Sequence, residues 1–561
     1  MNNKTDFSVL IGGKAGFGID RSSTFIANIF NRLGYRPYIY RDYPSLIRGG
    51  HTFSIIRAAK EKIAAHSERI DFLLALNQET LDLHKGELSE GAVIIYDSDS
   101  VKKETLPPDK KSAGVPLAGI IKEEKLPEIM RNSGMVGALC KAAGIDWKII
   151  EEVFIKNFGN KAGQNLNIAK KAYGAVPEFV KIEPLGRKPL PLLTGNEAIG
   201  LGLINGGLDA YLAYPMTPTS PILHFLAGEA ENFSLKVIHP ESEIAVMMMA
   251  AGFAYCGQKT AVGTSGGGFC LMTEGLSFSG MAELPVVIVL GQRPGPSTGL
   301  PTYSAQTELH FALNAGQGEF PRLIVAPGDA EEAYYWSEIA LNIAWKFQVP
   351  AFILSDKTMG EGLYSFDINT VKELPEEGPP RWDRQGEYKR YLDTETGVSP
   401  LAFPPDKEAV IKTNSYQHDE AGITVEDSAT TVKMLDKLLR KEKYIARELD
   451  KYETVKTYGD PGSDTALLCW GSNKGVCVEA AKKFGLKVIQ PVALWPFPAE
   501  QFSKAAKGVK KIIAVENNAT AQLTRLANGF GFGADEKILR YDGRPFSLEG
   551  LEGLIGRALK K

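Results

Sequence analysis

Short apolar runs alternate with helical patterns along most of the chain, most clearly between Leu208 and Arg293. Apolar runs of about four to eight residues, each followed by a helix-like stretch, predict a parallel sheet with helices on both faces. Ligands of such sheets bind beyond the carboxyl ends of the strands, where the connecting turns lie. The turns that hold Thr217, Glu241 with Glu243, and Arg293 are therefore predicted to line one crevice.

The pattern predicts an α/β fold class with three domains. A first α/β domain spans 1–182, and the proline-rich stretch IEPLGRKPLPLL links it to a doubly wound α/β domain over 190–365. Residues 366–452 hold a proline-rich, charged crossover with little periodicity and an amphipathic connecting helix. A smaller parallel α/β domain over 453–561 completes the chain.

Two turns of the first domain leave alternatives open. In FSVLIGGKAGFGID, glycines from Gly13 to Gly18 would let the backbone approach a phosphate at a helix N-terminus. Their spacing is GxxGxG, whereas dinucleotide sites have GxGxxG, so a tight turn without a ligand is an equal alternative. Arg48, in the later RGG turn, is either an anion contact or a residue of a solvated edge.

Composition excludes several classes of function. The formal net charge of -3 gives no sign of the excess of basic residues that nucleic-acid-binding proteins usually have. No apolar run approaches the roughly 18 residues of a membrane helix, and the polar start MNNKTDFS differs from a signal peptide, so we expect a cytoplasmic protein. The five cysteines form no CxxC pair, so we expect small buried residues and predict no metal site in this chain.

Five strings of the sequence together resemble the alpha subunit of the 2-oxoacid:ferredoxin oxidoreductases. They are YPMTPTS, PESEIA, GQRPGPSTGLPT, GVSPLAFPP and SYQHDE. The resemblance is closest to the 2-oxoglutarate type, in which a gamma domain is fused in front of alpha, and it covers essentially the whole chain. It implies a gamma-like domain over 1–182, a thiamine pyrimidine-binding domain over 190–365 and a transketolase-C-terminal-like domain over 453–561.

The resemblance implies a thiamine-diphosphate enzyme that oxidatively decarboxylates a 2-oxoacid. Coenzyme A takes the acyl group, CO2 leaves, and the electrons pass to ferredoxin. We expect 2-oxoglutarate as the substrate, with pyruvate, branched-chain or aryl 2-oxoacids as alternatives. A non-catalytic assembly subunit is the alternative from another class of function.

For the cofactor, Glu243 and Pro215 take the family's binding positions. Glu243 matches the acid that shares a proton with the aminopyrimidine ring, as a general acid-base group must. Glu241, two residues earlier, is the rival acid. Both acids could instead only complement the dipole of the helix that follows.

For the substrate, Arg293 matches the cation that binds the 2-oxoacid carboxylate, and a guanidinium can do so through two hydrogen bonds. Thr217 and Thr298 would add hydroxyl donors. Each assignment has a structural alternative: Arg293 could cap the sheet or pair with an acid such as Glu308. Thr217 could belong only to a strand-to-helix turn with Ser220 as the N-cap.

The chain lacks a recognisable magnesium-diphosphate pattern and a cysteine cluster. The resemblance therefore implies a beta subunit that supplies Mg²⁺, the diphosphate half of the thiamine site and at least one [4Fe-4S] cluster. The expected assembly is a dimer of alpha-beta heterodimers that delivers electrons to ferredoxin.

Overall fold

The computed structural model describes residues 5–45, 49–375 and 377–560, so Arg48 lies outside the described residues. The structure has the predicted α/β class, with three separate sheets. The domain boundaries at 182, 365 and 452 stay predictions. The chain divides into two compact units. The first unit consists of Met1–Leu193, Glu361–Asp367 and Phe546–Gly553. The second unit consists of Thr194–Gly360, Ile368–Pro545 and Leu554–Lys561.

The first unit is built on a mixed eight-stranded sheet with the order β6-β5-β4-β1-β3-β2-β14-β7. Its strands are β1 (Asp6–Lys14), β2 (Arg36–Asp42), β3 (His51–Ala59), β4 (Ile70–Ala75), β5 (Leu88–Asp97), β6 (Lys111–Val115), β7 (Leu192–Thr194) and β14 (Leu363–Ser365). Its helices are α1 (Ile19–Arg32), α2 (Gln78–His84), α3 (Leu117–Glu124), α4 (Arg131–Ala142), α5 (Trp147–Phe158) and α6 (Ala162–Ala175), with short 3-10 helices at Lys85–Glu87, Lys103–Thr105, Glu128–Met130 and Gly159–Lys161.

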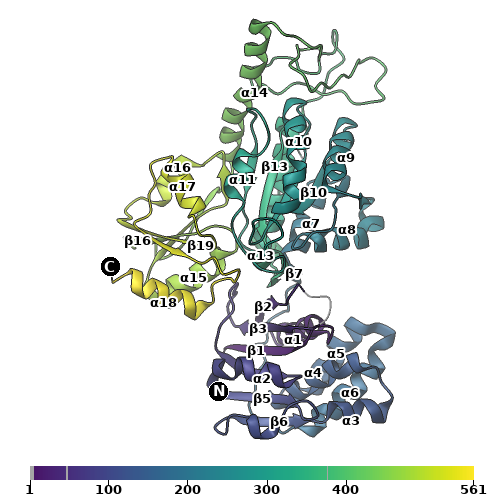
Figure 1. Ribbon diagram of the computed structural model, residues 1–561, viewed down its shortest axis with the longest axis vertical. Helices are drawn as coiled ribbons and strands as arrows, with labels where there is room; N and C mark the ends of the chain where they lie inside the picture. The colour runs from purple at the N-terminus through teal and green to yellow at the C-terminus, as the bar shows by residue number, and fades with distance from the viewer. Residues whose placement is uncertain (1–4, 46–48, 376, 561) are drawn as a thin grey trace. The chain divides into compact units, whose positions relative to one another are not determined.

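Strand β1 lies inside this sheet, antiparallel to β3 and parallel to β4 (Figure 1). Helices α1, α4 and α6 supply apolar side chains to the core that covers it. Helices α4 and α6 approach closely at Gly137, because a Cβ there would overlap the backbone of Ala169. Glycine at this position thus lets two helices pack on each other.

The second unit contains the predicted doubly wound sheet, in the order β18-β12-β13-β11-β10-β8-β9. Its strands are β8 (Ala210–Leu212), β9 (Lys236–Ile238), β10 (Thr260–Ser265), β11 (Val287–Gln292), β12 (Leu323–Val325), β13 (Ala351–Asp356) and β18 (Ala493–Trp495). The helices around it are α7 (Gly195–Asn205), α8 (Ser220–Phe233), α9 (Glu243–Tyr255), α10 (Gly266–Met281), α11 (Leu309–Asn314), α12 (Ala330–Phe347) and α13 (Lys357–Glu361).

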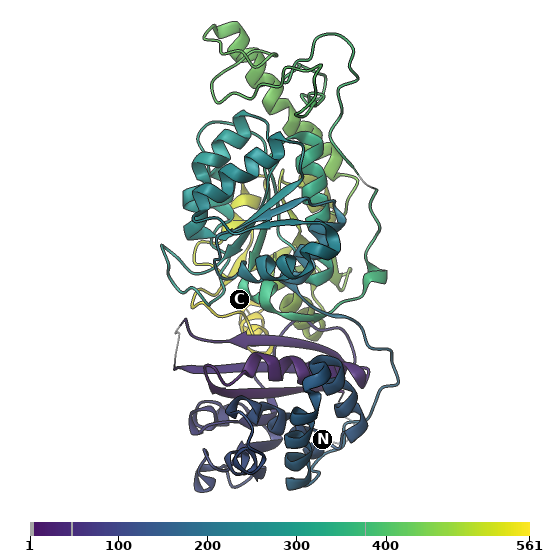
Figure 2. The ribbon, with the colours of Figure 1, turned by 90° about the vertical axis from the view of Figure 1, so that its right-hand side faces the viewer.

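Strands β8 to β13 all pair in parallel, whereas β18 adds to the edge antiparallel to β12. Ile288 and Leu290 of β11 share one apolar cluster with Phe269 of α10. The alternate residues Val287 and Val289 are fully buried and point to the other face of the sheet. Helices therefore cover both faces, as Figure 2 shows, and the connecting turns emerge at the carboxyl ends of the strands.

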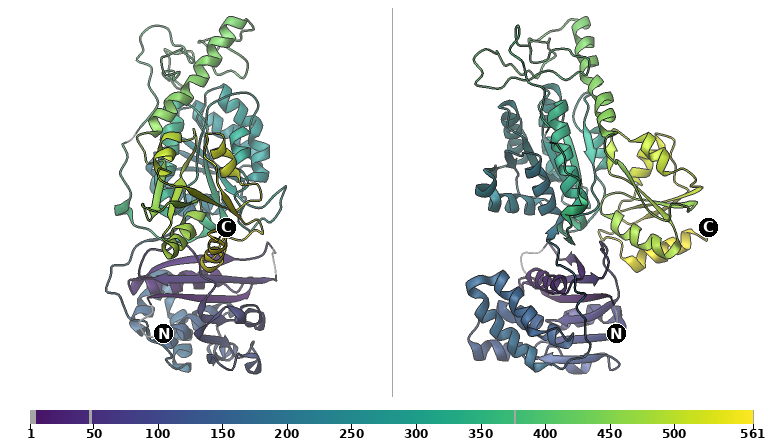
Figure 3. Two further views of the ribbon diagram at one scale, coloured as in Figure 1. Left: turned by 90° about the vertical axis from the view of Figure 1, so that its left-hand side faces the viewer. Right: turned by 180° about the vertical axis from the view of Figure 1, so that it is seen from behind.

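A smaller five-stranded sheet follows in the same unit, in the order β15-β17-β16-β19-β20. Its strands are β15 (Val455–Gly459), β16 (Thr465–Leu468), β17 (Lys487–Pro491), β19 (Lys511–Glu516) and β20 (Glu536–Leu539). The helices of this part are α14 (Ser428–Leu449), α15 (Asn473–Phe484), α16 (Ala499–Ala505) and α17 (Gln522–Asn528), while α18 (Leu548–Ala558) begins in the first unit and ends in the second. Helices α16 and α17 lie on one side of the sheet and α15 on the other (Figures 1 and 3). The predicted parallel pairing holds for β16, β17, β19 and β20, but β15 is an antiparallel edge strand.

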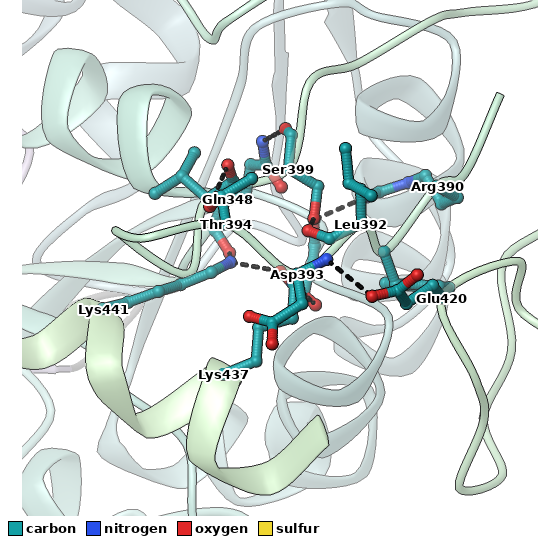
Figure 4. Close-up of polar contacts among 12 residues, drawn as sticks. Gln348, Arg390, Leu392, Asp393, Thr394, Ser399, Glu420, Lys437 and Lys441 are labelled. Atoms are coloured by element: carbon teal, nitrogen blue, oxygen red, sulfur yellow. Dashed lines mark hydrogen bonds and ion pairs between the residues drawn. The ribbon is translucent and has the colours of Figure 1, made fainter. Parts of the chain in front are cut away.

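The crossover before α14 has little regular structure beyond the 3-10 helix Ile368–Thr370. Polar contacts to ordered elements hold it in place (Figure 4). The amide Nε2 of Gln348 donates to the backbone oxygen of Ser399 at 2.6 Å, and the Ser399 hydroxyl donates to Leu392 O at 2.9 Å. These contacts join the crossover near Ser399 to Gln348, which directly follows α12. Among the described residues, no helix combines the length and the apolar character needed to cross a bilayer.

Candidate functional site

The turns after β8, β10 and β11 meet at one edge of the central sheet. Arg293 directly follows β11, and its Nη1 donates a hydrogen bond to the backbone oxygen of Thr217 at 3.0 Å. Ser265, the last residue of β10, directs its hydroxyl to the sulfur of Met216 at 2.6 Å. Two of the predicted turns, those that hold Thr217 and Arg293, therefore meet at this edge.

Glu243 is the first residue of α9 and has only 4% of its surface exposed. Ser242 caps the helix by accepting a hydrogen bond from Ala245 N at 3.4 Å. The Oε1 atom of Glu243 is buried and has no hydrogen-bond partner among the described residues. Glu241, by contrast, is exposed. The two acids of this turn therefore lie in opposite environments, because Glu243 is buried and Glu241 is exposed.

The first turn of α10 lies against two carboxyl groups. A Cβ at Gly268 would lie 2.5 Å from Glu243 Oε1, and a Cβ at Gly266 would lie 2.8 Å from Glu308 Oε1. The GGG stretch, Gly266–Gly268, begins this helix, although glycines are more typical of turns. A side chain at Gly266 would have to displace Glu308, and one at Gly268 would have to displace Thr264 Oγ1, at 2.2 Å, and Glu243.

Glu308 and Arg293 are both largely buried, each with 8% of its surface exposed. The Thr307 hydroxyl donates to Glu308 Oε1 at 2.8 Å, while Glu308 Oε2 and Arg293 Nε have no partner among the described residues. Burial raises the pKa of Glu308 to about 7, although Thr307 and Arg293 act in the opposite direction. Burial lowers the pKa of Arg293, and the charge of Glu308 partly offsets this shift. The two side chains thus act on each other electrostatically.

A further buried acid, Asp356, ends β13 beside this pair. Its Oδ1 accepts from the Ser304 hydroxyl and from Met359 N, both at 3.0 Å, and its Oδ2 accepts from the Ser472 hydroxyl at 2.6 Å. Burial raises the pKa of Asp356, against the effect of these hydrogen bonds. Because both oxygens are engaged, Asp356 has a structural role in fixing the loop.

The remaining predicted residues lie in the turns that follow β8 and β11. Pro215 and Thr217 are half-buried, and Thr298 is exposed on the loop after Arg293. In the same loop, sequence reasoning missed Thr302, which is 7% exposed and whose hydroxyl lacks a partner among the described residues. The density of hydroxyl residues in this loop was the only signal for it.

The turn that holds Thr217 differs slightly from the prediction. Thr219, not Ser220, is the N-cap of α8, and its hydroxyl donates to Met216 O at 3.1 Å. A proline does follow in the first turn, as predicted. The N-cap thus lies one residue earlier than predicted, because Ser220 is already the first residue of the helix.

Two protein-family models match this chain. A model described as pyruvate flavodoxin/ferredoxin oxidoreductase, thiamine diP-binding, matches residues 201–437, which include Glu243, Arg293 and Glu308. A model described as pyruvate ferredoxin/flavodoxin oxidoreductase matches residues 8–175. These three residues thus lie within the range that matches a thiamine-diphosphate-binding family.

Curated relatives and a solved structure match over nearly the full length. The 2-oxoacid:ferredoxin oxidoreductase subunit alpha of Sulfolobus sp is 30% identical over 99% of this chain and 97% of its own. The 2-oxoglutarate oxidoreductase subunit KorA of Mycobacterium tuberculosis is 26% identical over 98% of this chain and 91% of its own. The structure of 2-oxoglutarate:ferredoxin oxidoreductase from Magnetococcus marinus, with 2-oxoglutarate, coenzyme A and succinyl-CoA bound, matches with a TM-score of 0.89, 28% identity, and coverage of 99% of this chain and 100% of that chain.

Proposed function

We propose a function for this chain from its family: it belongs to the alpha subunits of the 2-oxoacid:ferredoxin oxidoreductases. It is an oxidoreductase subunit with a thiamine-diphosphate-binding domain. Beyond the family, we propose that it decarboxylates 2-oxoglutarate oxidatively, with coenzyme A, to succinyl-CoA and CO2, and that the electrons reach ferredoxin. Relatives with 2-oxoglutarate in their names support this substrate.

Glu243 is the acid-base group of the proposed site. Its buried Oε1 without a partner is the observation that carries this role, because a buried carboxyl oxygen is rarely left without a hydrogen bond unless a ligand completes it. Glu243 and Pro215 would hold the aminopyrimidine ring, and Glu243 would exchange a proton with a ring nitrogen. Bound thiamine diphosphate supplies the nucleophilic carbon that attacks the 2-oxo carbon and accepts the electrons left when CO2 departs.

Arg293 would bind the carboxylate of the 2-oxoacid. Its Nη1 is fixed by Thr217 O, and its Nε remains as a buried donor. A guanidinium held by one backbone contact presents its other N–H groups in a defined direction, which suits a planar carboxylate. Thr217 and Thr298 are the proposed hydroxyl donors, of which Thr298 would have to bring its exposed side chain to the ligand.

We propose that a beta subunit completes the enzyme. The cysteines of this chain are dispersed in sequence, whereas a [4Fe-4S] cluster needs four thiolates together. The cluster, Mg²⁺ and the contacts to the cofactor's diphosphate are therefore assigned to the partner, in a dimer of alpha-beta heterodimers. A name with "subunit alpha" among the relatives supports a multi-subunit enzyme.

The substrate is tested by turnover of the complex co-purified with its beta subunit. A panel of 2-oxoglutarate, pyruvate, branched-chain and aryl 2-oxoacids is assayed with coenzyme A and a viologen acceptor. The expected result is the highest kcat/KM with 2-oxoglutarate. A higher kcat/KM for another member of the panel would identify that 2-oxoacid as the substrate in place of 2-oxoglutarate. A lack of turnover with every member would favour the non-catalytic assembly subunit.

A further inference from the structure

We propose that Glu308 couples binding of the substrate carboxylate at Arg293 to the uptake of one proton. In the substrate-free enzyme an ionised Glu308 balances the charge of Arg293. When the carboxylate binds Arg293, Glu308 takes up a proton from solvent and becomes neutral. This inference rests on the proposed function and adds a residue that sets how substrate affinity depends on pH.

The position of Glu308 makes it the group that responds to charge at Arg293. Its Oε1 is held by the Thr307 hydroxyl at 2.8 Å, and its backbone N–H donates to Gln292 Oε1 at 3.2 Å. Its Oε2 is buried without a partner among the described residues. The absence of a Cβ at Gly266 gives the carboxyl group its place against the start of α10. One oxygen is thus anchored and the other is available to hold a proton.

The ionisable groups that act on Glu308 come from the ends of two strands. Arg293 at the end of β11 favours its ionised form, and Asp356 at the end of β13 disfavours it. The first turn of α10, Gly266–Gly268, has no ionisable side chain. On its own segment, His310 directs Nε2 to the backbone oxygen of Gln522 at 2.9 Å, away from the pair. Arg293 is therefore the cation that favours the ionised form of Glu308.

The charge balance of the pair explains the coupling. An ionised Glu308 and a charged Arg293 together carry no net charge, so a substrate carboxylate would add an unbalanced negative charge to a buried site. Burying an unpaired charge is costly, and a carboxyl group avoids the cost by taking up a proton. The pKa of Glu308, about 7 before any ligand binds, rises further when a second anion lies beside it. Binding therefore takes up a proton near neutral pH and weakens as the pH rises.

The test uses a 2-hydroxy acid with the carbon skeleton of the substrate, which keeps the carboxylate but has no oxo carbon to attack. Its affinity for the co-purified complex is measured by titration calorimetry from pH 6 to 9, in buffers of different ionisation enthalpy. The wild-type complex should take up close to one proton per site at pH 8 and lose affinity by up to about tenfold per pH unit above the pKa. Glu308→Gln should bind without proton uptake and with an affinity that does not depend on pH.

Glu338→Gln is the matched control, because Glu338 is another buried acid of the same unit whose pKa is raised by burial, but it bonds to Asn205 on α7. It should keep the wild-type pH dependence. Binding by the wild-type complex without proton uptake would overturn the inference, even if Glu308→Gln failed to fold. An identical pH dependence in Glu308→Gln and wild type would also overturn it. The proposed function fails separately, if the wild-type complex neither binds the 2-hydroxy acid nor turns over any 2-oxoacid.

Discussion

Arg293 Nη1 lies 3.0 Å from the backbone oxygen of Thr217. This hydrogen bond joins two turns that are 76 residues apart in sequence. The contact uses the carbonyl group of Thr217 and leaves its hydroxyl available. It also means that Arg293 has both a structural partner and a proposed ligand. The structural role of Arg293 affects the melting temperature, whereas its proposed substrate-binding role affects kcat/KM, so the two measurements distinguish the roles.

Arg293→Ala should lower kcat/KM for every 2-oxoacid by at least about tenfold, since a charge-assisted hydrogen bond contributes about 1.5 to 3 kcal/mol. Arg293→Lys should recover only part of this loss, because lysine keeps the charge but lacks the planar fork. Affinity for thiamine diphosphate should stay close to wild type. Kinetics and melting temperature are measured on the same preparations. A large fall in melting temperature with unchanged kcat/KM would leave Arg293 with the structural role alone.

Glu243→Gln should lower turnover by about two to four orders of magnitude, because an amide cannot exchange the proton that a general acid-base group must. Glu241→Gln is the control, since Glu241 is exposed while Glu243 is buried at the start of α9. The complex should still assemble with both variants, as judged by gel filtration. The assignment is reversed if Glu241→Gln is inactive and Glu243→Gln is near wild type.

Gly268→Ala should reduce activity as Glu243→Gln does, because its Cβ would lie 2.2 Å from Thr264 Oγ1 and 2.5 Å from Glu243 Oε1, so that the carboxyl group would have to move with its neighbour. Gly267→Ala, one residue earlier, is the matched control: its Cβ would meet only Ser297 O, at 3.7 Å. Alanine is the better helix former by up to about 1 kcal/mol, so the control should be as stable as wild type or slightly more stable. Equal activity of the two variants would show that the position of Glu243 is not critical.

The meeting of Thr217 and Arg293 could be predicted from sequence because the strand pattern is strong and parallel strands share one carboxyl edge. The start of α9 followed from its acidic first turn. The three glycines at 266–268 could not be placed in a helix from sequence, since glycine usually marks a turn, yet they begin α10. Their reason is tertiary: Gly266 and Gly268 make room for side chains from distant segments, and a local pattern holds no information about such contacts.

Other missed features also depend on contacts between distant segments. Strand β18 joins the edge of the central sheet through a pairing with β12 that lies about 170 residues away in sequence. Glu308 was visible only as a possible structural partner of Arg293, because it follows a loop whose path cannot be inferred from its turn-forming residues. Its burial decides its protonation, and burial of one acid in a loop is set by the whole fold.

Glu283, in the turn after α10, binds two fully buried lysines of α14, Lys437 at 2.7 Å and Lys441. Desolvation lowers the pKa of Lys441 to about 7, and Glu283 only partly offsets this shift. The unfolded chain, with an ordinary lysine, binds more protons between about pH 7 and pH 10, so this lysine makes the fold more stable as the pH rises through that window. The melting temperature of wild type minus that of Lys441→Met should therefore increase from pH 7 to pH 9.

Lys433→Met on the same helix is the control. Lys433 also forms an ion pair, with Glu420, but its own side chain is 51% exposed. The melting temperature of Lys433→Met should stay close to that of wild type at every pH. Glu283→Gln should cost about 3 to 5 kcal/mol, because it leaves buried cations without their anion. A pH-independent difference for Lys441→Met would show that Lys441 does not titrate in this range.

The most direct measurement is reduction of ferredoxin by the complex co-purified with its beta subunit, with 2-oxoglutarate and coenzyme A, alongside the Glu243→Gln complex. The wild-type complex should form one succinyl-CoA and one CO2 for every two ferredoxins reduced by one electron each, and the Glu243→Gln complex should be slower by about two to four orders of magnitude. No ferredoxin reduction with 2-oxoglutarate or any other 2-oxoacid, by a complex that has bound thiamine diphosphate and its iron-sulfur cluster, would contradict the proposed function.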